Sequence, residues 1–239
     1  MSTFNCLGFH LDNEKAFRIL IERALRFGRV VDVQVEESEA SGDNEAADDD
    51  HEDADPSAED ENRPTHCVLW TLPGKGGIEV WVLRDDDEHV VGCNPHLRST
   101  LDCPASITEG SEDVALVSCE GFRVHAEVPN TPFAVPGDTT VNLSLFVREI
   151  SKVADAEGAE VTLTAAKGDD PLLVRFTGPL ESAVQATNPD TETQYGVLTL
   201  ALSEASKLTM AVDTRRLKSL PTEGWVTGTG YLSAAAPRG

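Results

Sequence analysis

The chain has 239 residues and carries 42 Asp and Glu against 19 Lys and Arg, a formal net charge of −23. This balance argues against binding of nucleic acid through its phosphates, which needs a basic patch. No apolar run approaches the roughly 18 residues of a membrane helix, and the first residues lack the regions of a signal peptide, so we expect no membrane contact and a cytoplasmic location.

The N-terminal region predicts a strand, a helix and a second strand. The apolar run FNCLGFHL, residues 4–11, indicates a short strand, and RVVDVQV, residues 29–35, indicates another. Between them the pattern predicts a helix at Asn13–Phe27, with Asp12 as a suitable N-cap and Gly28 as a suitable residue after its end. The apolar side chains that share one face of this helix are Phe17, Leu20, Ile21, Ala24 and Leu25.

A strongly acidic segment follows. Residues 36–61 hold fourteen Asp and Glu, no Lys or Arg, and no apolar residue larger than Ala. Such a segment cannot bury enough surface to offset the entropy of ordering. We therefore predict a disordered acidic insertion over residues 36–63.

Three further strands are expected after the insertion. THCVLWTL (65–72) and GIEVWVL (77–83) are joined by the turn residues PGKGG and indicate a hairpin. EHVVGCNPHL (88–97) supplies the next strand. Residues 1–35 and 64–101 are thus predicted to form a small β-α-β-β-β domain.

The second half of the chain is predicted to be rich in strands. Residues 101–112 (LDCPASITEGSE) indicate a loop at the domain boundary, and from Phe146 to Val153 the apolar spacing favours a short helix at the end of a strand. The expected strands lie near 114–118, 122–128, 140–147, 161–166, 172–177, 197–202, 208–212 and 224–232. The predicted fold class is α+β, with a barrel-like or sandwich domain over residues 112–233.

The last expected strand carries three glycines in GWVTGTGYL. This pattern lies on a β run and not between a strand and a helix, so it does not indicate a phosphate-binding loop. Gly228 and Gly230 are instead interpreted as sites of a bulge or of a close backbone approach in a curled sheet.

The order of elements over residues 3–97, together with the segment HLDNEKAF, resembles one β-α-β-β-β module of the vicinal oxygen chelate, or glyoxalase-like, family. In that resemblance Glu79 matches the acidic metal ligand on a late strand, while the segment STFNC lacks the early histidine ligand. The resemblance implies a topology and, as an alternative function, a metal-dependent enzyme. The whole chain also resembles bacterial proteins that end in a strand such as GWVTGTGYLS, which implies no activity.

Polar clusters offer few candidates for chemistry. Cys93 and His96 have a spacing that zinc ligands use, and Glu79 joins them as a candidate through the resemblance. A turn with buried thiols is the competing interpretation. Further residues that could contribute to such a site are His10, His66, Cys67 and Cys103.

A cysteine nucleophile with a histidine base is the other catalytic option, using Cys93 with His96 or Cys119 with His125. The motifs GxSxG, GxxxxGK[ST] and HExxH do not occur in the sequence, so we expect no catalytic residues and no cofactor. The wide cysteine spacings favour free thiols over disulfides. Trp70, Trp81 and Trp225 are interpreted as cross-strand aromatic contacts or, alternatively, as the wall of a pocket.

These observations favour a non-catalytic binding or adaptor protein of the bacterial cytoplasm. The acidic segment indicates a protein partner, and a run of negative charge would attract a basic surface on that partner. The glyoxalase-like enzyme or small-molecule-binding protein remains the alternative.

Overall fold

The structure is a computed structural model that describes residues 3–31, 66–73, 77–107, 114–129, 137–168, 170–216 and 221–235. The predicted acidic insertion lies outside these residues. Of the residues described, 58% are in strands and 12% are helical, with a single α-helix and two sheets. The prediction of an α+β fold with a β-α-β-β-β module is therefore wrong, and the protein has a β-rich fold.

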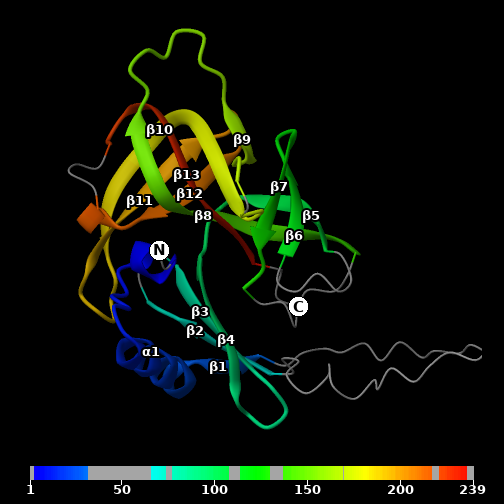
Figure 1. The fold of residues 1–239 in the computed structure, drawn as a ribbon, viewed down its shortest axis with the longest axis vertical. Coiled ribbons are helices and arrows are strands. Elements are labelled where there is room, and N and C mark those ends of the chain that lie inside the picture. Colours follow the sequence, from blue (N-terminus) through cyan, green and yellow to red (C-terminus); the bar gives the residue numbers. More distant parts are fainter. Residues whose placement is uncertain are drawn as a thin grey trace, which may run out of the picture.

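The N-terminal layer consists of a 3₁₀-helix, one α-helix and a four-stranded antiparallel sheet (Figure 1). The sheet order is β1-β2-β3-β4, and the α-helix packs against β2 and β3. The elements are η1 (Thr3–Leu7), α1 (Glu14–Phe27), β1 (Arg29–Val31), β2 (His66–Thr71), β3 (Ile78–Arg84) and β4 (Val90–Leu97).

The predicted first strand is η1 instead. Phe4, Cys6, Leu7 and Phe9 are all buried, whereas a strand on the face of a sheet would bury only alternate residues. A tight turn brings these side chains to one side of the chain, and Gly8 accommodates it with a φ of +78°. Because this first strand is missing, residues 3–97 do not have the predicted β-α-β-β-β order.

Helix α1 confirms the predicted helix, with one change at its start. The side chain of Asn13, and not Asp12, caps it by accepting a hydrogen bond from the backbone N–H of Ala16 at 2.9 Å. At the other end Gly28 lies against the sheet, where a Cβ atom would come within 2.5 Å of a Val68 methyl group. Gly28 is thus required by close packing and not by a left-handed conformation.

We expect Leu20→Ala to lower the free energy of unfolding by about 3 kcal/mol, because Leu20 is buried between α1 and the sheet and its removal leaves a cavity. Urea unfolding measures the loss. Ile19→Ala, on the exposed face of the same helix, is the matched control and should change stability by less than about 0.5 kcal/mol. Equal losses for the two variants would show that the buried face has been assigned wrongly.

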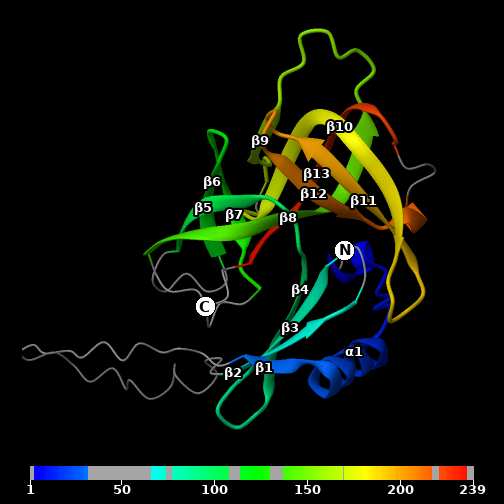
Figure 2. The same ribbon diagram turned by 180° about the vertical axis from the view of Figure 1, so that it is seen from behind.

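Five strands close into a barrel, which can be followed in Figures 1 and 2. Around the ring, β8 pairs with β13, β13 with β10, β10 with β11, β11 with β12, and β12 returns to β8. Only the β12–β8 pairing of this ring is parallel. The strands are β8 (Gly137–Lys152), β10 (Leu173–Thr187), β11 (Gln194–Ala201), β12 (Lys207–Val212) and β13 (Gly224–Ala235).

Three strands form a second ring on the ribbon of β8 and β13. They are β5 (Asp102–Ile107), β6 (Val114–Cys119) and β7 (Phe122–Glu127), which connect β8 to β13 in that order. The short strand β9 (Thr162–Ala165) extends the sheet beyond β10, and η3 (Thr214–Arg216) follows β12. The prediction of a loop over residues 101–112 is wrong for β5, where alternate side chains face the core despite a proline and short polar residues.

The predicted helix at the end of β8 is also wrong. The strand continues to Lys152 because β13 pairs with it along residues 142–152. A register shift lies at Thr229/Gly230, and a Cβ on Gly228 or Gly230 would meet backbone oxygens of β8. The interpretation of these glycines as sites of a bulge and of close backbone approach is therefore confirmed.

Three buried clusters stabilise the described parts, the smallest being Cys67, Leu69, Trp81 and Leu83 within the small sheet. Two of them are more extensive. The larger fills the barrel and the second ring with aliphatic side chains. The other joins η1, α1 and the small sheet to Phe146, Tyr195 and Ala211 on the outer surface of the barrel. Among the described residues, no helix is both long and apolar enough to cross a membrane.

Candidate functional site

A cleft of about 560 Å³ lies between the N-terminal layer and a wall made by β7, β13 and the turn before β10. Its apolar lining comes mainly from η1 and α1, with Pro95 on β4 and Leu172 just before β10. Phe4 and Phe17 form part of this lining, and their rings meet edge to face with centroids 6.1 Å apart. The cleft therefore offers an aromatic surface at the junction of two layers, a common place for ligand sites.

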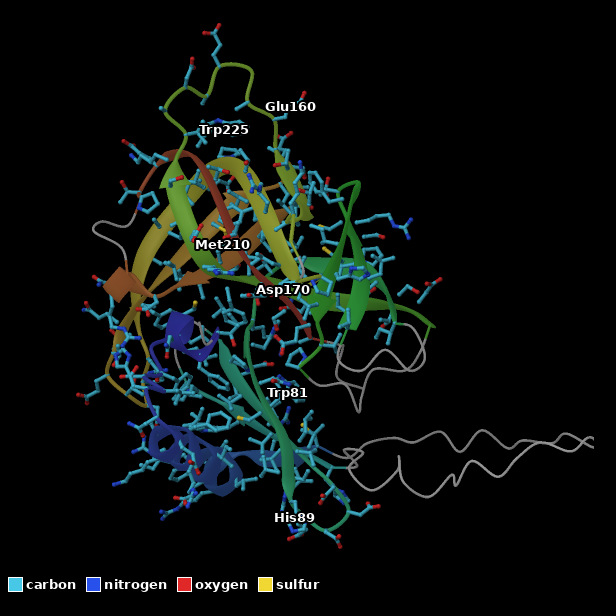
Figure 3. All side chains as sticks on the ribbon, viewed as in Figure 1. Trp81, His89, Glu160, Asp170, Met210 and Trp225 are labelled. Carbon is cyan, nitrogen blue, oxygen red and sulfur yellow. The ribbon has the colours of Figure 1, made fainter. Side chains whose placement is uncertain are left out.

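All charged lining residues of this cleft that the structure describes are carboxylates: Glu14, Glu127 and Asp170. They come from α1, β7 and the turn before β10. Figure 3 shows Asp170 near the middle of the molecule, between the barrel and the strands β5–β7. The charged groups of the lining thus come from three elements, and Glu14 among them is already paired with Arg18 Nη2 at 3.0 Å.

Asp170 is held in place by two hydrogen bonds. The Tyr231 hydroxyl donates to Oδ2 at 2.9 Å, and the backbone N–H of Leu172 donates to Oδ1 at 3.1 Å. Burial raises the pKa of Tyr231, and the hydrogen bond to Asp170 raises it further. The phenol thus remains a protonated donor at neutral pH. Each carboxylate oxygen of Asp170 keeps further acceptor capacity for a ligand.

The segment Cys93–His96 is divided between this cleft and the interior. Cys93, Asn94 and Pro95 line the cleft, whereas His96 is fully buried. Residues three apart in a strand point to opposite faces, so Cys93 and His96 do not converge. Burial raises the pKa of Cys93 to about 12, which leaves it a neutral thiol at neutral pH.

Glu79 lies directly opposite His96 in the β3–β4 pairing and is buried. Its carboxylate accepts a hydrogen bond from Arg98 Nη1 at 3.1 Å, within an ion pair. Across the part of the chain that the structure describes, no three His, Cys, Asp or Glu side chains lie close enough to hold one metal ion. Glu79 is engaged by the guanidinium and does not face Cys93.

His96 is the centre of a buried polar network that joins β4 to β8 and β13. Its Nδ1 lies 2.9 Å from Ser233 Oγ, and its Nε2 lies 3.2 Å from Asn142 Oδ1. Asn142 Oδ1 also accepts from the backbone N–H of Ser99 at 2.9 Å, which assigns the proton to His96 Nε2 and makes Nδ1 the acceptor for Ser233.

A serine, a histidine and an asparagine linked in series resemble a nucleophilic triad, but these side chains are too deeply buried for a substrate to reach them. Ser233 is 1% exposed and His96 is 0% exposed. No substrate can reach a hydroxyl in that position without separation of the two layers. The network is therefore a structural connection.

The other residues singled out in the sequence are dispersed. Cys119 faces the core while His125 is exposed on the next strand, so they cannot act as a pair. Burial and the nearby Cys93 raise the pKa of Cys67 to about 12. His10 and His66 are not lining residues of the cleft.

The tryptophans do not form a shared wall. Trp70 lies opposite Val80 and Trp81 opposite Leu69, so the two indoles point to opposite faces of the small sheet. Trp81 lies in that sheet and Trp225 at the far end of the barrel (Figure 3). The interpretation as a cross-strand pair or a common pocket wall is therefore wrong.

Sequence reasoning missed Asp170, Tyr231 and Glu127, which come from turns and strands far apart along the chain. Of these three, only Tyr231 could have been noticed in the sequence, because it is a polar aromatic residue on an expected strand with small neighbours. The sequence matches no protein-family model, no curated protein and no solved structure.

Proposed function

We propose that this protein is a non-catalytic binding protein of the bacterial cytoplasm whose cleft takes a cationic group of a ligand or protein partner. The observation that carries the proposal is the lining of the cleft, which combines the carboxylates of Glu14, Glu127 and Asp170 with the aromatic pair of Phe4 and Phe17. Carboxylates attract an ammonium or guanidinium group, and aromatic faces add a cation–π contribution.

The charge distribution supports the same kind of partner. The acidic segment 36–61 and the carboxylates of the cleft have the same sign, so both would favour a basic surface. Phosphate groups do not suit a cleft with these charged lining residues. All five cysteines are free thiols, which fits a reducing compartment.

The glyoxalase-like alternative is not carried forward as a second function. It depended on a β-α-β-β-β order that the structure does not have. Of its candidate ligands, His96 and Glu79 share one face of the small sheet, whereas Cys93 points to the other face.

A labelled hexalysine peptide provides a direct test. We expect Leu172→Arg, which places a positive charge in the cleft, to weaken binding of this peptide by about tenfold or more through repulsion and lost complementarity. Thr164→Arg adds the same charge at an exposed position on β9 and should change the dissociation constant by less than about twofold. Fluorescence polarisation measures both.

A further variant separates the cleft from the acidic segment. Replacing residues 36–61 with a Gly/Ser linker of equal length should reduce the salt dependence of binding, because fewer charges attract the peptide. In the linker variant, Leu172→Arg should still weaken binding of the peptide. If the linker variant loses all binding and Leu172→Arg has no effect in the intact chain, the segment binds the peptide and the cleft does not.

A further inference from the structure

Two cysteines of the second ring, Cys103 on β5 and Cys119 on β6, lie close enough to interact. The β5–β6 pairing sets Ala105 opposite Val117 and Ile107 opposite Ala115. Continued by two residues, this antiparallel register sets Cys103 opposite Cys119. Both side chains face the core, as their exposures of 1% and 5% show. Their thiols form a hydrogen bond with each other.

We propose that Cys103 and Cys119 form a reversible disulfide and constitute a redox modification site. Opposed residues in an antiparallel pair have Cα atoms about 4.5–5.5 Å apart, within the range of about 4.4–6.8 Å that a disulfide spans. The backbone can therefore accept the bond with only local adjustment. The site takes a low-molecular-weight disulfide, of the class of oxidised glutathione, as its oxidant.

Cys119 is buried but lies at the edge of the ring, and an oxidant reaches it only when the end of the hairpin opens. Cys119 ends β6, and Glu120 and Gly121 form the two-residue turn to β7 with φ values of 49° and 81°. Two left-handed residues are typical of a tight hairpin turn. Opening the end of this hairpin would expose Cys119 and would break the hydrogen bond that the Ser206 hydroxyl donates to Glu120 Oε1.

The hydrogen bond assigns different roles to the two thiols. The Cys103 thiol donates to the Cys119 sulfur, which lowers the pKa of Cys119 and raises that of Cys103. Burial and the carboxylate of Glu120 oppose the effect at Cys119. Cys119 is thus the attacking thiolate and Cys103 the resolving thiol.

The reaction proceeds in two exchanges. The Cys119 thiolate attacks one sulfur of the small disulfide, forms a mixed disulfide and expels one thiolate of the oxidant. Cys103 then gives its proton to that thiolate and attacks the Cys119 sulfur, which expels the second thiolate. The protein loses two electrons, and the oxidant is reduced to two thiols. Excess reduced thiol reverses both steps.

The other three cysteines are placed differently. Cys6 donates its thiol to the backbone carbonyl of Val147 at 3.5 Å. Cys67 and Cys93 have pKa values raised to about 12, so they hold little thiolate at neutral pH. These thiols serve as internal controls in the same molecule.

The test counts thiols in the full chain after equilibration with oxidised and reduced glutathione. Free thiols are then alkylated with N-ethylmaleimide in denaturant and counted by intact mass. Five adducts are expected under reducing conditions, and two fewer, with loss of two hydrogen atoms, under oxidising conditions. Cleavage after Arg98, Glu112 and Arg123 separates the two cysteines, so the fragments stay linked only through the proposed bond.

Matched variants make the outcome decisive. In Cys103→Ser and in Cys119→Ser, the number of free thiols should no longer fall by two on oxidation. In Cys93→Ser, it should still fall by two, as in the parent chain. Oxidation should raise the melting temperature by roughly 5–10 °C, reversibly with dithiothreitol, because the bond closes a loop of about fifteen residues. Retention of all five thiols at every glutathione ratio, or a bond that maps to Cys93, would overturn the proposal.

Discussion

Replacing Gly228 with alanine should lower the free energy of unfolding by about 5 kcal/mol or more, or abolish cooperative folding. A Cβ atom at this position would lie 2.1 Å from the backbone oxygen of Glu149 and 2.7 Å from the ring of Phe176. The oxygen belongs to β8, which is paired along β13, so it cannot withdraw. Overpacking of a rigid core is among the few mechanisms that give so large a loss.

The control must distinguish the steric clash of the added Cβ atom from the general cost of replacing a glycine with alanine. Gly158 has a φ of +74°, and an added Cβ would meet nothing within 4 Å. Gly158→Ala should therefore cost only about 1–2 kcal/mol, from backbone strain alone. Urea unfolding followed by tryptophan fluorescence compares the two. A loss for Gly228→Ala no larger than that for Gly158→Ala would show that β13 can move away from β8.

The glycines of β13 illustrate what the sequence could predict. Glycine inside a β pattern indicates a bulge or a close approach, and that inference needs no knowledge of the partner strand. The hairpin of β2 and β3 and the helix α1 were predictable for a similar reason. Their periodicity and their turn or capping residues all lie within one continuous stretch of the chain.

The N-terminal 3₁₀-helix could not be predicted in the same way. FNCLGFHL has the composition of a strand, but its side chains are buried on several sides by α1, the small sheet and the barrel surface. That environment exists only in the folded protein, and tertiary contacts override local preference. Strand β5 is the opposite case. Its proline and short polar residues indicate a loop, but it forms a strand because β6 and β8 pair with it on both sides.

The candidate cleft was the least predictable feature. Its acidic residues Glu14, Glu127 and Asp170 come from three elements far apart in sequence, and none belongs to a recognisable motif. His96 shows the same limitation. The pattern Cys93-x-x-His96 indicated a ligand pair, but the alternation of the strand turns the imidazole away from the thiol and toward β8 and β13.

We expect His96→Ala to lower the free energy of unfolding by about 4 kcal/mol. The substitution removes a fully buried ring and leaves a cavity between β4 and the barrel. It also deprives the buried hydroxyl of Ser233 of its acceptor and Asn142 of a donor, and unpaired buried groups add about 1–3 kcal/mol. Urea unfolding gives the total.

His89→Ala is the matched control, because the His89 side chain is 76% exposed at the β3–β4 turn. Its effect should stay below about 0.5 kcal/mol. A double-mutant cycle with Ser233→Ala tests the network itself. If the hydroxyl and the imidazole are paired, the double variant should lose about 1 kcal/mol less stability than the sum of the two single losses. If His96→Ala costs no more than His89→Ala, or if the cycle is additive, then the imidazole does not connect the small sheet to the barrel. The two layers would then be held together by their other contacts, which include the packing of Phe146 and Tyr195 and the hydrogen bond from Asn188 Nδ2 to the Leu7 carbonyl at 2.8 Å.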